Sequence, residues 1–447
     1  MSRHVITALV LAAAPLLPAS AQVRADSTSG PRPVRLTAPL TLVQAVELGR
    51  RQAVAATVAR VNTRVAQARV GQRRADLLPF VAGSASYTRN TVNLDEFGLE
   101  IPGAPKVTDP FDIWRLQLRA SQTLVDLPAF TRLAAARDSV IAAGLDAEAA
   151  GNLAGATAGL AYLRLLSAHF TVQAREADSA VAFELLEQAK QLTDAGVAPA
   201  IDRTQNEVNF ATARGQLVVA RNERDRARLD LLRALFLPLD TEVPLPDDVA
   251  PAEQEAIPTD PAEAVAFALA HRPELEAERQ RTDLARRQAR AIQHENLPTM
   301  GVSGGVNESG RSELRSSWYI QVGVQVPILD GLRRQKRAQE QAVRIELQQL
   351  REQDLAQQIE QDVRKALLDL ASAREQVAVA RERLRLARQQ LEQAQERFNA
   401  GVAGSVETTQ AQAALTSARD ALIQSMINFG TARVSAYRAL GALDQLR

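Results

Sequence analysis

Cysteine is absent from this chain of 447 residues, aromatic side chains make up only 4%, and the two signs of charge almost cancel. Without cysteine there can be no disulfide, no thiolate metal site, no cysteine nucleophile and no lipid anchor on an N-terminal cysteine. Lysine and arginine together number 53, against 52 for aspartate and glutamate. That balance argues against a nucleic-acid-binding protein, which would carry an excess of positive charge.

Motifs that carry chemistry are missing as well. No metalloprotease HExxH pattern, glycine-rich phosphate loop or Gly-x-Ser-x-Gly nucleophile turn occurs. Paired carboxylates occur only where intrahelical ion pairs on a helix surface explain them. The histidines are scattered along the chain, at His4, His169, His271 and His294. We therefore expect no enzymatic activity, no cofactor and no metal site.

The N-terminus has the pattern of a secretory signal peptide. Arg3 and His4 precede an apolar run from Val5 to Leu17, and Ala19-Ser20-Ala21 follows as a cleavage pattern. The run is too short to span a bilayer, and no later segment reaches the roughly 18 apolar residues of a transmembrane helix. We expect residues 1–21 to be removed on export and residues 22–40 to form an extended leader.

The rest of the chain is an internal duplication. Ala195-Gly196-Val197-Ala198 recurs as Ala400-Gly401-Val402-Ala403, and other landmarks recur in the same order, among them Trp114 with Trp318. A cluster of prolines between the two copies marks a linker. The sequence thus predicts a first repeat at 41–237, a linker at 238–260 and a second repeat at 261–447. Each repeat should run helix, β-hairpin, very long helix, glycine turn and helix.

The long helix of the second repeat shows its packing period. Residues 332–400 contain neither proline nor glycine, and large apolar residues and alanines follow a heptad, which predicts a seam packed along other helices. The equivalent helix at 127–195 has a weaker pattern and four glycines near its start. The seam residues are Val363, Leu370, Val377, Leu384, Leu391 and Phe398, with Ala366, Ala373, Ala380, Ala387 and Ala394.

Short segments before the long helices alternate between apolar and polar residues. Strands of about ten residues with one apolar and one wet face are typical of a transmembrane β-barrel. Both tryptophans of the chain, Trp114 and Trp318, lie at matching places on the apolar faces, which predicts an aromatic girdle facing lipid. The wet faces, which we expect to line a lumen, carry Arg115, Arg119, Gln321 and Gln325.

Four strands cannot close a barrel. Open strand edges in hydrocarbon cost several kcal/mol per unpaired group, so strands that meet lipid require several copies of the chain. Three chains would supply twelve strands. The alternative is a small sheet that covers a soluble core, although the flanking helices offer nothing obvious to cover.

The chain resembles the TolC-type outer-membrane efflux protein family from about Leu40 to Leu443. The resemblance rests on a Leu-Pro pair before each hairpin, on Val326–Gly331, and on Phe398–Val402 followed by Val406-Glu407. It implies a mainly helical chain with membrane strands and two internal repeats. Three such chains would form a twelve-stranded barrel in the outer membrane, continued by a long α-helical barrel in the periplasm.

The resemblance also implies partners and site residues. A periplasmic adaptor protein would dock on the turns at Gly196-Val197 and Gly401-Val402, and an inner-membrane pump of the RND, ABC or MFS class would complete the assembly. Glu407 matches the first acidic position of the family's periplasmic aperture. Gln410 stands where a second acid can occur, so the ring would carry less negative charge. The chain would be an exit duct for efflux or type I secretion, in contact with outer-membrane lipid.

Other hypotheses are a periplasmic adaptor, a purely structural coiled-coil protein of the envelope and, more remotely, an enzyme. An adaptor should have one helical hairpin between β-rich halves, rather than two duplicated units. A structural coiled coil would not need alternating strands with tryptophan.

Overall fold

The computed structural model describes residues 38–94, 96, 98, 105–196, 199–246, 257–258, 260–311, 313–399, 402 and 405–446. The expected signal peptide, nearly all of the expected leader, Val197, Gly401 and residues 247–256 of the expected linker lie outside the described residues. Within the part described, the elements form two compact units. One unit holds the sheet and the helix segments next to it. The other holds α2, α5 and the adjoining segments of α4, α8 and α9.

The structure corrects the prediction of one helix before each hairpin, because there are two. Arg272 is extended (φ −77°, ψ 117°) and precedes Pro273, which has no N–H to donate and disfavours helical geometry in the residue before it. Ala53 breaks the first repeat with a similar conformation (φ −54°, ψ 142°) and no proline after it. The resulting helices are α2 (Leu42–Gln52), α3 (Val54–Ala75), α6 (Pro261–His271) and α7 (Pro273–His294).

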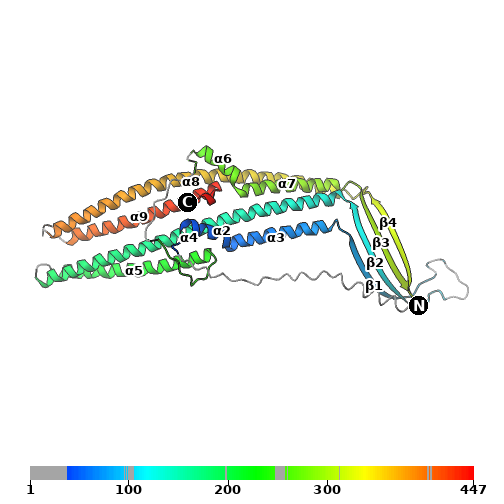
Figure 1. Cartoon of the computed structure of the whole chain (residues 1–447), viewed down its shortest axis with the longest axis horizontal. Coiled ribbons are helices and arrows are strands. Elements are labelled where there is room, and N and C mark those ends of the chain that lie inside the picture. Colours follow the sequence, from blue (N-terminus) through cyan, green and yellow to red (C-terminus); the bar gives the residue numbers. More distant parts are fainter. Residues whose placement is uncertain are drawn as a thin grey trace. The chain divides into compact units, whose positions relative to one another are not determined.

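The strands form a single antiparallel sheet in the order β1-β2-β3-β4, so the two hairpins lie side by side (Figure 1). Its outer strands, β1 and β4, each have one edge that pairs with no other strand among the described residues. A bulge between Thr123 and Val125 shifts the register of β2 against β3. The strands are β1 (Phe80–Asn90), β2 (Phe111–Val125), β3 (Thr299–Gly310) and β4 (Arg315–Gln325).

Long helices follow each hairpin, as predicted. They are α4 (Leu127–Asp194, 68 residues) and α5 (Ala200–Ala234) in the first repeat, and α8 (Arg333–Asn399, 67 residues) and α9 (Ser405–Leu440) in the second. A short 3₁₀ turn, Leu443–Gln445, follows α9. The element order of the two repeats is therefore the same.

In the unit with the sheet, the helices lie in the order α3, α4, α7, α8, which is the order of the strands that they continue. Thr63 of α3 donates to the Ala143 carbonyl of α4 (3.0 Å). Arg281 of α7 pairs with Asp146 of α4, and Gln341 of α8 donates to the Ala285 carbonyl of α7 (3.0 Å). Each helix thus packs on its neighbours in one layer, and α3 and α8 are the outer helices.

In the other unit the order is α5, α4, α9, α8. Arg221 of α5 pairs with Glu176 of α4 (2.9 Å), and Arg419 of α9 pairs with Asp178 of α4 (2.9 Å). The α8–α9 contact has an apolar centre, made by Leu384 and Ala387 against Leu415 and Ala418. Helix α4 has partners on two sides in both units, whereas α8 lies at the edge of each.

The predicted heptad seam of α8 is buried, which confirms that the heptad positions form a packed stripe. Among the large positions, Val363, Leu370, Val377 and Leu384 are buried, and Leu391 packs against the α8–α9 cluster. All five seam alanines are buried as well. Alanine at alternate core positions lets the neighbouring helix approach closely.

Tyr162 ties the start of the described chain to α4. Its hydroxyl donates to the Leu40 carbonyl (2.7 Å), and the Leu40 N–H donates to the Pro244 carbonyl (2.9 Å). Burial raises the pKa of Tyr162 to about 12, so the phenol remains a donor at any physiological pH.

Candidate functional site

The strand register puts most of the apolar positions of the four strands on one face of the sheet. Residues directly opposite each other in an antiparallel pair project from the same face. Trp318 pairs with Val306, which pairs with Leu118, so this row runs from β4 through β3 to β2. The next row joins Ile320, Gly304, Ala120 and Val81 in the same way.

The two tryptophans share this apolar face, and both are exposed in the single chain. Trp318 is 75% exposed and Trp114 is 53% exposed. Trp114 lies against the Tyr87 ring, with centroids 4.8 Å apart, and the Tyr87 hydroxyl donates to Asp112 (2.8 Å). The apolar face therefore has an aromatic pair at the hairpin end of β1 and β2, and the hydroxyl of its tyrosine binds a carboxylate.

The opposite face of the sheet is polar. Arg115 pairs with Ser309, which pairs with Arg315, and Arg119 pairs with Gly305, which pairs with Tyr319. A Cβ at Gly305 would lie 2.9 Å from the Tyr319 ring, so the absence of a side chain makes room for the tyrosine. Gln321 and Gln325 continue this face along β4. The sequence-predicted wet residues thus lie on one face, opposite the tryptophans.

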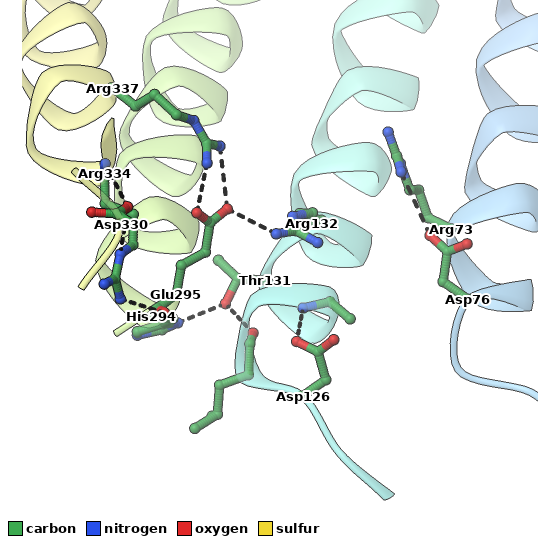
Figure 2. A network of polar contacts seen from close by, with 12 residues as sticks. Arg73, Asp76, Asp126, Thr131, Arg132, His294, Glu295, Asp330, Arg334 and Arg337 are labelled. Atoms are coloured by element: carbon green, nitrogen blue, oxygen red, sulfur yellow. Dashed lines mark hydrogen bonds and ion pairs between the residues drawn. The ribbon is translucent and has the colours of Figure 1, made fainter. Parts of the chain in front are cut away.

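A polar network that the sequence did not reveal joins the helices where they meet the strands (Figure 2). Glu295, just after α7, accepts hydrogen bonds from Arg132 of α4 (2.8 Å) and from Arg337 of α8 (2.6 and 3.2 Å). Burial alone would raise the pKa of Glu295, but the hydrogen bonds from Arg337 and Arg132 outweigh it and hold this pKa below its usual value. One carboxylate therefore connects three helices.

Caps at the strand-to-helix joints complete the network. Asp126 accepts a hydrogen bond from the Ala129 N–H (2.9 Å), as expected of a helix cap. Its counterpart Asp330 accepts from both the backbone N–H and the guanidinium of Arg334 (3.0 and 2.9 Å). Thr131 and the His294 ring are 2.9 Å apart (Figure 2). These contacts fix the direction in which the long helices leave the sheet.

The helix turns have the geometry of a glycine stop where the structure describes them. Gly196 has φ +73°, a left-handed conformation that ends α4, and its N–H donates to the Thr193 carbonyl (3.0 Å). Near the second turn, the Val402 N–H donates to the Arg397 carbonyl (3.0 Å), and the Val402 side chain is exposed.

Glu407 is paired within its own chain. Its carboxylate lies 3.1 Å from Arg397 Nε, across the turn between α8 and α9, and both side chains are about half exposed. Gln410, one helical turn further along α9, is exposed. The first repeat has a looser pair of reversed sign across its turn, between Asp194 and Arg203 (3.9 Å). The sequence alone does not single out Arg397, the residue that pairs with Glu407.

A second ionic cluster links the two repeats between α4 and α9. Arg175 bridges Asp178 and Asp420, and Asp178 also accepts from Arg419 (2.9 Å). Asp178 is buried. Burial disfavours the charged form of Arg175, but the bonds of Arg175 to Asp420 and Asp178 outweigh this effect and raise the pKa of Arg175. No periodicity argument could pair these residues, because they lie more than half the chain apart.

The family of the chain follows from a sequence-family model. The model of the outer membrane efflux protein family matches residues 45–235 and 265–442, one stretch for each repeat. Together the stretches cover most of the chain, so the chain belongs to the outer membrane efflux protein family. Its members are pore proteins of the outer membrane without enzymatic activity. Among curated proteins, no sequence matches the chain.

Solved structures show the same TolC-type fold. The CmeC outer membrane channel of Campylobacter jejuni superimposes with a TM-score of 0.76 at 18% identity, covering 90% of this chain and 85% of that one. The outer-membrane channel OprN gives 0.75 at 20% identity, covering 90% of each chain. The outer membrane protein VceC of Vibrio cholerae gives 0.75 at 16% identity, covering 90% of this chain and 96% of that one. A chain with two repeats, each of which contributes a hairpin to one sheet and a pair of long helices, fits neither the adaptor nor the scaffold hypothesis.

Among the described residues, no helix is both long and apolar enough to cross a membrane.

Proposed function

We propose that the chain is the outer-membrane exit duct of a tripartite efflux pump or of a type I secretion system. It would passively carry small molecules or exported polypeptides from the periplasmic assembly to the exterior. The observation that carries this proposal is the sheet itself, which has one mainly apolar face, one mainly polar face and two edges that no described strand covers. Only a closed barrel satisfies such a sheet in lipid.

Closure requires further copies of the chain. The free edges of β1 and β4 can pair with each other between neighbouring chains, which is a head-to-tail contact that closes into a ring. Three copies with four strands each would give twelve strands, within the range of known barrels. Two copies would give only eight strands, and the interior of an eight-stranded barrel is just wide enough for side chains to fill. The homotrimer is thus the smallest ring whose interior leaves room for a passage.

The outer helices support the same closure. On α3, four valines repeat at helical spacing and are all exposed: Val54, Val58, Val61 and Val65. On α8, Val343, Leu347 and Leu350 form a similar exposed stripe. Apolar stripes on the two outermost helices of one layer are what neighbouring copies would cover.

In the outer membrane, the Trp114 and Trp318 face would meet lipid, and Arg115, Arg119, Gln321 and Gln325 would line the lumen. Residues 1–21 would direct export as a signal peptide, and residues 22–40 would form the leader. The first repeat would be 41–237 and the second 261–447, with the linker at 238–260 between them. The helical part would lie in the periplasm.

The helix turns would receive a periplasmic adaptor that connects the duct to an inner-membrane RND, ABC or MFS pump. Next to Gly196 and Val197, Ile201 is 68% exposed, and next to Gly401 and Val402, Val406 is similarly exposed. Exposed apolar residues beside tight turns are suited to a helical partner that covers them.

Glu407 would form a ring of three carboxylates at the periplasmic aperture, with Gln410 as a neutral second ring. The ion pair with Arg397 reduces the negative charge available to a cation there. We expect Glu407→Ala to weaken cation block in a planar bilayer and Arg397→Ala to strengthen it. Identical block in both variants would contradict a role for this ring.

The proposal is tested by particle mass, conductance and thiol labelling of the detergent-purified and reconstituted protein. Because the chain has no cysteine of its own, a single introduced cysteine is the one thiol that can be labelled. Gln321→Cys should react with a membrane-impermeant thiol reagent, whereas the adjacent Ile320→Cys, on the apolar face, should be protected. A monomeric particle without conductance, or equal labelling of both cysteines, would refute the proposal.

A further inference from the structure

The charged side chains of the strands are segregated between the two faces of the sheet. The polar face carries Arg115, Arg119 and Arg315 and no acidic residue within the described strands. Both strand acids, Asp112 and Glu308, lie on the apolar face, Asp112 beside Tyr87 and Glu308 opposite Leu116 and Ser316. The remaining strand cation, Arg89, also lies on the apolar face, 3.8 Å from Asp112.

These arginines are close enough for their fields to add. Arg115 and Arg315 occupy one row through Ser309, two strand spacings apart, which is about 10 Å. Arg119 lies four residues along β2 from Arg115, about 13 Å at strand rise. Both separations are comparable with the Debye length of about 10 Å at 0.1 M salt.

Nothing in the described part of the chain neutralises them. No carboxylate among the described residues lies within ion-pair distance of the three guanidiniums. At the hairpin end of the same face, Arg311 lies over the Phe111 ring, with its guanidinium carbon 4.2 Å from the centroid. The positive charge of this face therefore extends to the end of the strands.

We propose that the barrel lumen is electropositive and selects small anionic solutes over cations. This inference rests on the proposed function, because it requires the polar face to enclose the lumen. Three arginines in each of three chains would place nine guanidiniums around one water-filled passage. Low-dielectric walls focus such a field and concentrate counter-ions, and basic rings are the means by which pores favour anions.

The reactivity of a single cysteine on the polar face reports the electrostatic potential at that point, whether the periplasmic aperture is open or closed. Ser317 lies on β4 two residues from Arg315, and the row of Arg119 comes next along the strand. Its neighbour Ser316 is on the opposite face, paired with Glu308. Ser317→Cys and Ser316→Cys are therefore a matched pair that differs in face and in the nearest charge.

The experiment compares the reaction rates of an anionic and a cationic methanethiosulfonate with each cysteine in the reconstituted protein. The anionic-to-cationic rate ratio is divided by the same ratio for a free thiol in solution. We expect a normalised ratio of about ten at Ser317→Cys in low salt, and a value of about one or less at Ser316→Cys. Molar salt should reduce the ratio at Ser317→Cys to about one, because it shortens the Debye length to about 3 Å.

Replacing all three arginines tests their role directly. In the Arg115→Gln, Arg119→Gln, Arg315→Gln background, the ratio at Ser317→Cys should fall about tenfold, whereas the three Arg→Lys changes should preserve it. A ratio near one in the native background, or an unchanged ratio in the glutamine variant, would overturn the inference. Those results are distinct from failure of the proposed function, in which the lumen cysteine at Gln321 would label no better than its lipid-side neighbour.

Discussion

Helices α4 and α8 occupy equivalent places in the two repeats and have nearly the same length, yet they pack differently. Helix α4 has α3 and α7 beside it in one unit and α5 and α9 in the other. Within the described part of the chain, helix α8 packs on α7 in the first unit and on α9 in the second. The difference is one of position, because α4 lies inside each layer of helices and α8 lies at its edge.

The difference explains why only one of the two sequences shows a clear heptad. A helix with neighbours on one side buries one stripe, and α8 concentrates its buried residues in the Val363–Ala394 seam. A helix with neighbours on two sides buries residues around most of its circumference, and α4 buries alanines, leucines and Tyr162 without one dominant period. A weak heptad in this fold thus marks a central helix.

The largest expected effect comes from charging the outer side of α8. If a neighbouring chain covers that side, Leu347→Glu should convert the trimer to monomers, because burial of the leucine, worth about 2 kcal/mol per interface, would be replaced by burial of a charge. Light scattering of the detergent-solubilised particle measures the mass. The control Gln349→Glu adds the same charge at a nearby exposed polar residue and should leave the mass unchanged. A trimer that survives Leu347→Glu would mean that this stripe is not an interface.

The next largest effect is expected on the central helix. Asp178→Ala removes the buried acceptor shared by Arg175 and Arg419 and should lower the free energy of unfolding by about 3 kcal/mol, because Arg419 loses its bond to the cluster and Arg175 keeps only Asp420. Chemical denaturation followed by circular dichroism measures it. The matched change on the edge helix, Glu382→Ala, breaks the exposed pair with Arg385 and should leave the unfolding midpoint unchanged. Equal midpoints for the two variants would contradict a structural role for the α4–α9 cluster.

Two leucines of α8 that lie two residues apart sharpen the comparison further. Leu370 is 5% exposed in the seam and Leu368 is 71% exposed on the outer side. Leu370→Ala should cost about 2–3 kcal/mol through the cavity that it leaves, and Leu368→Ala should cost clearly less. The same denaturation assay compares them. An equal loss at both positions would show that α8 is packed on two sides, and the distinction from α4 would disappear.

The sequence predicted what depends on local periodicity and missed what depends on distant pairing. Alternation along β4 was enough to assign Trp318 and Gln321 to opposite faces, and the heptad was enough to place Leu370 in a core. Whether the polar face encloses a lumen stays a prediction, because it depends on other copies of the chain. The roles of Glu407, Gln410 and the helix turns remain predictions for the same reason.

The misses have identifiable physical reasons. Pro273 indicates in the sequence that the helix before the second hairpin is divided, whereas no proline follows the break at Ala53. Arg397 and Glu407 meet only because a turn folds α9 back on α8. Arg175 and Asp420 meet only because the two repeats pack together. Side-chain pairs of this kind follow from the tertiary fold, so a single sequence does not indicate them.

The smallest expected effect tests Glu295, a carboxylate that contacts both the central and the edge helix. Glu295 accepts from Arg132 of α4 and Arg337 of α8, and its pKa lies below the ordinary value, so its ionised form favours the folded state. That contribution is present above the unfolded pKa of about 4.3 and is lost as pH falls through the lower folded value. Glu295→Gln should therefore lower the free energy of unfolding by about 1 kcal/mol at pH 7, with the difference from the native chain vanishing towards pH 3.

Variants of the two arginines show how much of this pH-dependent stabilisation comes from the bond to α4 and how much from the bonds to α8. Arg337 makes two hydrogen bonds to Glu295 and Arg132 makes one, so Arg337→Ala should shift the acid midpoint of unfolding further than Arg132→Ala. Urea titrations at a series of pH values measure both. If the two variants behave alike, Glu295 responds to the total positive charge at the junction. If Arg337 dominates, the carboxylate mainly anchors the edge helix α8, which among the described residues packs on α7 alone in this unit.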